Sequence, residues 1–474
     1  MSFANVLVFF DKNLLTFAMR CLVWRKSRNH HLQEHRMPKR LLIIATALTT
    51  ASCANIAAFQ PDAFLPPTPD AWSAAADGAG EIEAQDWVQS LGAPQLAALV
   101  DEALGANPGL AQSLARYDAA RAGARLAGAG RVPTLNLGSD YSRTEAYSGA
   151  GSDSFSLGLS SSWEVDLWGR VRDGANAGTL DAEAAADDLR SARLSVAGFV
   201  AKGWLALIEA RQQSELAERD VRRSQNSVDL TDRRFGRGLA RSSDVRTARS
   251  ALASSQAALA SRQRVEAVAA RNLETLLGRY PSGQISGEGD FPEIDALAGV
   301  GSPADLLMRR PDVRAAERRL VAAGLRADAA GKALFPRLSL SGGTGSGGAD
   351  VADMFDLDTL VSNLTASIAA PIFAGGSLRA QRDQAEANAQ LQVASYVSTV
   401  LNAWQEAENA IYADEILARR VDSLQQAFNE AAEAEALVIR QYASGVATIF
   451  DLLNAQSRRI SAESQYISAR RDRA

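Results

Sequence analysis

Apolar and polar side chains alternate along two stretches of this chain. In the first, the apolar residues Phe155, Leu157, Leu159, Trp163, Val165 and Leu167 are separated by polar residues and glycine. The second stretch repeats the pattern, with Leu364, Ala366, Ile368 and Ile372 against Asn363, Thr365 and Ser367. Such alternation predicts strands, near 133–147 and 153–167 in the first half. It is typical of transmembrane barrels, although a soluble sheet packed on one face shows it too.

The other recurring pattern is helical. Residues 108–131 are rich in Ala and Arg, and residues 170–235 contain no proline. At ~1.5 Å per residue, the longer stretch spans roughly 100 Å. A further helix is predicted to end near residue 277. Coiled-coil spacing, with one step skipped at Glu435, joins Leu417, Val421, Leu424, Phe428, Ala431 and Val438. The pattern predicts packing against neighbouring helices; an ordinary helical bundle is the alternative.

The chain consists of two similar halves of about 200 residues. The segment RFGRGLARSSDVRTA matches RQYASGVATIFDLLNA, so that Phe235 corresponds to Tyr442 and Asp244 to Asp451, an offset of 207. WGRVR matches GGSLR at the same offset, and VPTLNL matches FPRLSL at an offset of 203. Three matched blocks in the same order indicate a duplication. Each half is therefore predicted to contain a helix, two strands, a very long helix, a turn and another helix.

The residues before Cys53 read as a targeting signal. A basic start at Met37 leads into an apolar run that is too short to span a membrane as a helix. Ala51 and Ser52 before Cys53 are typical of a bacterial lipoprotein, with diacylglycerol on the Cys53 thiol. Thr50 stands where leucine is usual, so ordinary signal cleavage nearby is the alternative. We expect Met37 to be the true start; an unusually long signal is the rival interpretation.

These features divide the chain into five parts. They are an extension and signal peptide (1–52), a proline-rich extended tether (53–92), the first repeat (93–280), a Gly- and Pro-rich linker (281–302) and the second repeat (303–474). The second repeat is expected to lack ten or more residues at its carboxyl end. The first repeat continues from Asp244 to Leu277, and an equal stretch counted from Asp451 would end at position 484, beyond Ala474. Truncation of the sequence or a trimmed collar would explain the difference.

Composition excludes several kinds of chemistry. His30, His31 and His35 all precede Met37, and the two cysteines are Cys21 and Cys53. A chain that begins at Cys53 has no histidine and one cysteine, which excludes histidine-based catalysis and His or Cys metal sites. We therefore expect no catalytic residues, metal or cofactor. A net charge of −5 argues against nucleic-acid binding.

Several motifs carry a family resemblance, which extends from about residue 60 onward. They are Asn107-Pro108-Gly109-Leu110, the WEVDLWGR segment at 163–170, the LMRRPDV segment at 307–313, and Phe335-Pro336. Together they resemble the outer-membrane efflux factor family, the TolC-like channels of NodT type.

The resemblance implies an α+β membrane protein that forms a homotrimer. Its twelve-stranded β-barrel, four strands per chain, would lie in the outer membrane and continue into a long α-helical coiled-coil barrel in the periplasm, with 281–302 in an equatorial region. The implied function is the passive exit duct of a tripartite efflux system, for small molecules pumped by an inner-membrane transporter through a periplasmic adaptor. The strand count argues independently for an oligomer, because four strands cannot close a barrel in lipid.

In this family the two matched turns are periplasmic tips where the tunnel narrows. The resemblance therefore implies gate residues Asp451, Asp244, Tyr442 and Asn454. Three copies of Asp451 would form an acidic ring that selects for cations, and Asn454 stands where a second acid is frequent. Tyr442 and Asp244 are expected to be hydrogen-bonded in the closed state. The alternative is that both aspartates simply start helices.

Other interpretations stay open. They are a channel for type I protein secretion, a trimeric coiled-coil structural protein of the envelope, and an envelope enzyme. The glycine run Ser341–Gly348 lacks the lysine of a phosphate loop and is expected at a strand end or in an extracellular loop. The cluster Arg309–Asp312 is interpreted as a helix start rather than an anion site.

Overall fold

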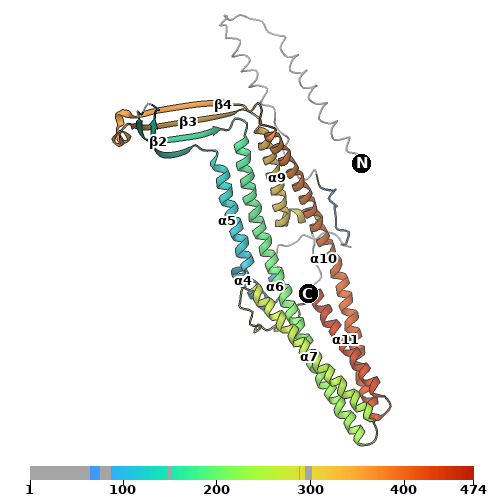
Figure 1. Cartoon of the computed structure of the whole chain (residues 1–474). Helices are drawn as coiled ribbons and strands as arrows, with labels where there is room; N and C mark the ends of the chain where they lie inside the picture. Colours follow the sequence, from blue (N-terminus) through green and yellow to red (C-terminus); the bar gives the residue numbers. More distant parts are fainter. Residues whose placement is uncertain (1–63, 75–86, 148, 150, 288, 294–300) are drawn as a thin grey trace, which may run out of the picture. The chain divides into compact units, whose positions relative to one another are not determined.

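The computed structural model describes residues 64–74, 87–147, 149, 151–287, 289–293 and 301–474 (Figure 1). Contacts separate Met1–Ala58 from Phe59–Ala474, and the described residues all belong to the second unit. The targeting signal and Cys53 lie outside the described residues.

The order of elements repeats between the two halves of the chain. The helices are α3 (Trp87–Ser90), α4 (Pro94–Ala106), α5 (Pro108–Ala129), α6 (Arg170–Gly236), α7 (Ser242–Leu276), α8 (Pro303–Arg309), α9 (Pro311–Lys332), α10 (Ser377–Ser444) and α11 (Ile449–Arg473). The strands are β1 (Thr134–Glu145), β2 (Gly151–Val165), β3 (Arg337–Gly348) and β4 (Val361–Ala369), with the short helices η4 (Val351–Phe355) and η5 (Leu357–Thr359) before β4. The predicted plan, helix–strand–strand–long helix–turn–helix, is confirmed twice.

Both long helices begin in the same way. Gly169 before α6 and Gly376 before α10 each have φ of 82°, a left-handed conformation that side chains beyond glycine rarely adopt. These two glycines are separated by 207 positions, the offset found in the sequence. The helices are 67 and 68 residues long, so each spans roughly 100 Å.

The four strands form one antiparallel sheet in the order β1-β2-β3-β4. Tyr141 pairs with Phe155 and Leu137 with Leu159 between β1 and β2. The register continues across the sheet, so that Trp163 pairs with Leu340, and Leu340 in turn pairs with Ala366. The alternating apolar positions of all four strands therefore share one face, as the sequence predicted. The glycine run of Ser341–Gly348 forms the carboxyl end of β3, which is the first of its two expected places.

Beside the sheet, the helices follow one another as a layer. α5 contacts α6, α6 contacts α9, and α9 contacts α10. Farther from the sheet, α6 pairs with α7 and α10 pairs with α11, while α11 also contacts α6 and α7. In Figure 1 the two hairpins, α6–α7 and α10–α11, run side by side to their turns.

Ion pairs hold α6 against α9. Four acidic residues of α6 face four basic residues of α9; the pairs are Asp173–Lys332, Asp181–Arg326, Glu183–Arg318 and Asp188–Arg319. Asp187 of α6 is fully buried and is surrounded by Arg190, Arg314 and Arg318. A buried carboxylate requires such partners, so this ladder fixes the antiparallel register of α6 and α9.

The largest apolar core lies where α4, α6 and α7 meet. Leu96, Leu207, Ile208 and Leu273 are at most 1% exposed there, and Ile467 of α11 packs on the same cluster. By length and composition α6 is also the one helix among the described residues that could cross a membrane. Several of its apolar residues, including Leu207 and Ile208, supply this core.

The linker after α7 is fastened to that helix. The Glu274 carboxylate accepts hydrogen bonds from the backbone N–H groups of Gly283, Gln284 and Ile285 at 2.6, 2.9 and 3.2 Å, and from the Ser282 hydroxyl at 3.0 Å. These bonds, led by that of Gly283, hold the pKa of Glu274 below its ordinary value. The Gly- and Pro-rich segment therefore has a defined start.

Candidate functional site

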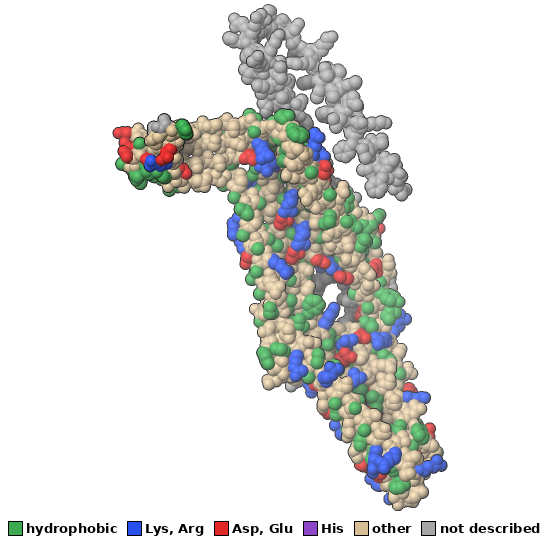
Figure 2. Space-filling view, viewed as in Figure 1, with side chains coloured by type: hydrophobic (Ala, Val, Ile, Leu, Met, Phe, Trp, Pro, Cys, Tyr) green, Lys and Arg blue, Asp and Glu red, His purple; other side chains and the backbone are tan. Residues whose placement is uncertain are grey.

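The sheet presents an uncharged band of membrane-compatible length. Leu137 of β1 and Leu364 of β4 are 70% and 82% exposed on its apolar face. Residues 154–163 of β2, 338–348 of β3 and all of β4 contain no charged side chain, and Figure 2 shows charges gathering at the loop end of the sheet and over the helices. A strand that crosses a bilayer needs about 9–11 residues, which these segments supply.

The WEVDLWGR and Phe335-Pro336 motifs meet where strands pass into helices. The Asp166 carboxylate accepts hydrogen bonds from the backbone N–H groups of Val171 and Arg172 at 3.1 and 2.7 Å, which caps the start of α6. The Trp168 indole N–H donates to the Pro336 carbonyl at 2.6 Å, and its ring lies 5.3 Å from that of Phe335. These motifs therefore join the two repeats at the base of the sheet.

The cluster Arg309–Asp312 starts a helix, as predicted. Pro311 occupies the first turn of α9. The Arg310 guanidinium donates to both oxygens of Asp312, at 3.0 and 2.7 Å, and to Glu406 of α10 at 2.7 Å. Burial alone would raise the pKa of Asp312, but the hydrogen bonds and charge of Arg310 hold it below its ordinary value. Arg310 therefore links α9 to α10, and its charge is paired with two carboxylates of the chain itself.

At the tip of the second hairpin, Asp451 caps α11. Its carboxylate accepts hydrogen bonds from the Thr448 backbone N–H at 2.8 Å and the Thr448 hydroxyl at 2.6 Å, and the Thr448 hydroxyl accepts from the Asp451 N–H at 3.2 Å. This is a capping box. The side-chain and backbone bonds of Thr448 lower the pKa of Asp451, and the residue is exposed. Asp451 therefore caps the start of α11 through contacts within its own chain.

At the tip of the first hairpin, Asp244 occupies the matching position of α7. Its carboxylate accepts a hydrogen bond from the Arg241 backbone N–H at 2.9 Å. The residue before α7 is an arginine, whose side chain makes no capping hydrogen bond, whereas Thr448 does so before α11. The two tips are therefore related by the duplication but are not equally capped.

Tyr442 connects the two hairpins, through partners that the sequence did not predict. Its side chain is buried, and its hydroxyl lies 2.9 Å from that of Thr231 on α6. The Arg234 guanidinium lies over the Tyr442 ring, 4.7 Å from the centroid, and donates to the Tyr442 carbonyl. The expected bond from Tyr442 to Asp244 is not formed within the described chain, because Asp244 turns back to cap α7. Asn454 lies on the exposed surface and accepts from Arg458 at 3.1 Å.

A buried charged cluster between α6, α10 and α11 escaped the sequence analysis. The Arg459 guanidinium lies 3.3 Å from Glu435 and 2.5 Å from Glu463, and Arg219 donates to Glu463 at 2.7 Å. Burial raises the pKa of Glu435, with Arg223 opposing the shift and Asp220 and Glu463 adding to it. The sequence contains one signal of this cluster. Glu435 occupies a position of the coiled-coil pattern where the other members are apolar.

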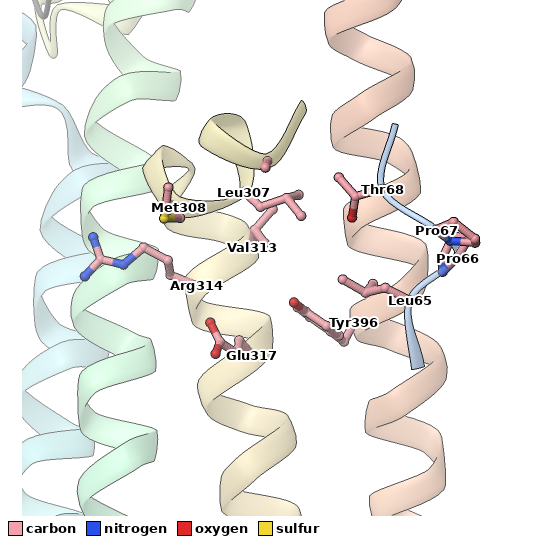
Figure 3. Close-up of a pocket in the computed structure, with 11 residues that line it drawn as sticks. Leu65, Pro66, Pro67, Thr68, Leu307, Met308, Val313, Arg314, Glu317 and Tyr396 are labelled. Atoms are coloured by element: carbon pink, nitrogen blue, oxygen red, sulfur yellow. The ribbon is translucent and has the colours of Figure 1, made fainter. Parts of the chain in front are cut away.

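The segment before α3 is fastened to α10. The Glu408 carboxylate accepts from the backbone N–H groups of Ser73 and Ala74 at 2.8 and 2.9 Å, and the buried Trp72 indole donates to the Gly301 carbonyl at 3.0 Å. Leu65 packs on the cluster that contains Tyr396. A cavity of about 660 Å³ lies between this segment, α8, α9 and α10, and Figure 3 shows the side chains that line it.

Comparison with known proteins gives a consistent result. The sequence profile of the family described as "Outer membrane efflux protein" matches residues 99–279 and 302–474. The pyoverdine export outer membrane protein OpmQ of Pseudomonas aeruginosa is 31% identical over 91% of this chain and 93% of its own length. Outer membrane protein OprJ of the same organism is 32% identical over 86% and 88%.

A solved channel has the same fold. The open state of the MtrE outer membrane channel of Neisseria gonorrhoeae superposes with a TM-score of 0.76 at 28% identity, covering 86% of this chain and 94% of that one. The expected α+β membrane-protein fold is thereby confirmed. Since the family profile spans well over half of the chain and the similarity to OpmQ extends over nearly all of it, this protein belongs to the outer membrane efflux protein family and is an outer-membrane channel of an efflux system.

Proposed function

We propose that three copies of this chain close a twelve-stranded barrel that serves as a passive exit duct. The observation that carries the proposal is the sheet itself. β1 and β4 are its two edges, and its apolar residues share one exposed face. An open edge in lipid leaves backbone groups unpaired at several kcal/mol each. Pairing β4 of one copy with β1 of the next removes both edges.

Light scattering of detergent-extracted protein tests the trimer. We expect a protein mass of three chains, because each chain leaves two edges that only other copies can pair. A stable, folded monomer would contradict the closed barrel and with it the duct.

In the full system, the duct would receive small molecules from an inner-membrane transporter through a periplasmic adaptor that engages the hairpin tips. The similarity of nearly the whole chain to a pyoverdine export protein, together with the match to the outer membrane efflux protein family, supports this role. Co-purification of cross-linked adaptor and pump with the wild-type channel is the expected outcome. Efflux that continues unchanged in cells lacking this protein and any related channel would contradict the assignment.

For the gate, we propose that the tips converge at rest and that three copies of Asp451 form an acidic ring. Exposure of Asp451 on the tip supports this; its capping bond to Thr448 supports the helix-start role. Two variants separate the roles. Asp451→Asn removes charge and is expected to lower cation preference in planar bilayers, whereas Thr448→Ala weakens the cap and keeps the charge. Unchanged ion selectivity in Asp451→Asn would assign the residue to the helix cap alone.

For the anchor, we propose that Cys53 carries diacylglycerol in the outer membrane. Leu65 packs near Tyr396 of α10, which lies roughly 30 Å along the helix from its start beside the sheet. The stretch from Cys53 to Leu65 reaches about 40 Å when extended, enough to place the lipid in the same membrane. Mass spectrometry should find the lipid on wild-type protein and not on Cys53→Ala. Any retained residue before Cys53 would exclude it.

A further inference from the structure

The two hairpins leave one helix exposed on each side of the chain. α6 and α11 contact each other, α7 contacts both of them, and α10 pairs with α11 and α9. α7 and α10 therefore lie on opposite sides of the α6–α11 contact, as Figure 1 shows. Apolar side chains are exposed on each, including Val265 and Val268 of α7 at 43% and 42%, and Leu437 of α10 at 51%.

Opposite charges accumulate on these two helices. The basic stripe, residues 246–271 of α7, contains five arginines and one acidic residue. The acidic stripe, residues 414–433 of α10, contains five acidic residues and two arginines. The tips lie at Ser242, where α7 begins, and at Ser444, where α10 ends. At ~1.5 Å per residue, both stripes lie within about 45 Å of these tips.

Contacts within the chain do not neutralise the excess charge. The two arginines of the acidic stripe are engaged, Arg419 with Glu415 at 3.6 Å and Arg420 with Asp472 at 2.9 Å. In the basic stripe, Arg249 pairs with Asp232 of α6 at 3.2 Å. Among the described residues, Asp422, Glu430, Arg262 and Arg264 form no ion pair. The acidic stripe therefore keeps a negative excess and the basic stripe a positive one, on opposite sides of the molecule.

We infer that the basic stripe of one copy packs against the acidic stripe of the next copy in the ring. The inference rests on the proposed trimer and states which surfaces join below the sheet. A head-to-tail contact forms a ring when its rotation closes, as it does in a trimer. Packing of two basic stripes or of two acidic stripes would bring charges of one sign together and is disfavoured. The stripes thus give the helical part the same direction of assembly that β4-to-β1 pairing gives the sheet.

Cross-linking between copies tests the contact. Ser261 of α7 and Gln426 of α10 are both exposed. Each lies roughly 28 Å from its tip along the helix, so Ser261→Cys and Gln426→Cys in one chain place thiols at about the same level. With a short bismaleimide, we expect covalent dimers and trimers on denaturing gels. Each single-cysteine variant is the control for reactions through Cys53.

Charge reversal in the protein with both cysteines tests whether the charged stripes set the contact. Asp422→Arg with Glu430→Arg should reduce the cross-link yield severalfold, and adding Arg262→Glu with Arg264→Glu should restore it. A matched control, Asp350→Arg with Asp358→Arg in the exposed loop before β4, makes the same charge change away from both stripes and should leave the yield unchanged.

Light scattering on the same samples separates the outcomes. A trimer without the α7–α10 cross-link would overturn the stripe contact and leave the proposed duct standing. A cross-link that survives the reversal would show that charge does not set the contact, and overturns the inference equally. A monomeric wild-type protein would contradict the proposed function itself.

Discussion

The helices α6 and α10 arose from the same repeat element, yet their surroundings differ. They are 67 and 68 residues long, but far more side chains of α6 are buried than of α10. α6 is covered by α4, α5, α7, α9 and α11, whereas α10 contacts mainly α9 and α11. One copy of the repeat has become the centre of the chain and the other its edge.

The difference shows which surfaces are covered by the chain's own helices and which are left exposed. Leu391, Leu401 and Tyr412 of α10 are 62%, 46% and 64% exposed within the chain. Most of the stability of a helix comes from tertiary packing, so a long helix with few buried residues gains little of it from its own chain. The edge helix and the edge strand β4 follow one another in sequence, so one neighbouring copy would cover both.

Replacing a core residue of α6 should have the largest effect on stability. Ile208 is fully buried, and Ile208→Ala should lower the free energy of unfolding by about 2–5 kcal/mol through lost contacts and a cavity. Leu401→Ala on α10 is the matched change, and its effect should be smaller because that side chain is 46% exposed within its own chain. Denaturant unfolding of the assembled protein measures both. Equal losses would erase the proposed contrast between centre and edge.

A charge on the apolar face of the edge strand should come next. Leu364→Arg should cost about 2–4 kcal/mol in a bilayer if it lies near the midplane. Asn363→Arg, one residue earlier and on the opposite face, should cost far less. Folding yield in lipid vesicles reports the difference. Similar yields for the two variants would indicate that neither face contacts lipid.

Removing the cap of the edge hairpin should have a modest effect. Thr448→Ala removes a side chain that bonds the Asp451 N–H and should destabilise the start of α11 by about 0.5–2 kcal/mol. Arg241→Ala at the matching position of the first hairpin should change little, since that side chain makes no capping bond. Hydrogen exchange at the two tips distinguishes them, and equal protection changes would disprove the asymmetry.

The pH dependence of the contact between the hairpins should be the smallest effect. Burial raises the pKa of Glu435 above its ordinary 4.5, and burial likewise raises that of Asp220. The folded state therefore binds a proton on Glu435 more tightly than the unfolded state does. This stabilises the folded state fully below pH 4.5, and the stabilisation is lost as the pH rises through the raised pKa. Glu435→Gln should therefore flatten the decline of thermal stability with pH. An unchanged pH profile would show that Glu435 does not titrate in this range.

Local pattern predicted the elements but not their partners. Alternation placed β2 and β4, and the absence of proline placed α6, because strand and helix periods are properties of neighbouring residues. The Tyr442–Thr231 contact and the docking of Trp72 on Gly301 each join residues more than two hundred positions apart; neither has a local signal. Asp244 and Asp451 were recognised through the turns, and their bonds to Arg241 and Thr448 fit the helix-start alternative. The expected tie to Tyr442 concerned Asp244 alone, and the acidic ring of Asp451 stays a prediction.

The central claim, that the edges of this chain are paired by other copies, is tested most directly at the strands. With cysteine at Gly138 on the polar face of β1, a second cysteine is placed in turn at Asn363, Leu364, Thr365, Ala366 and Ser367 of β4. Within one chain β2 and β3 separate these strands, so a disulfide can form only between copies. The account predicts covalent trimers from polar-face positions among Asn363, Thr365 and Ser367 and none from Leu364 or Ala366. Monomers at every position would contradict it.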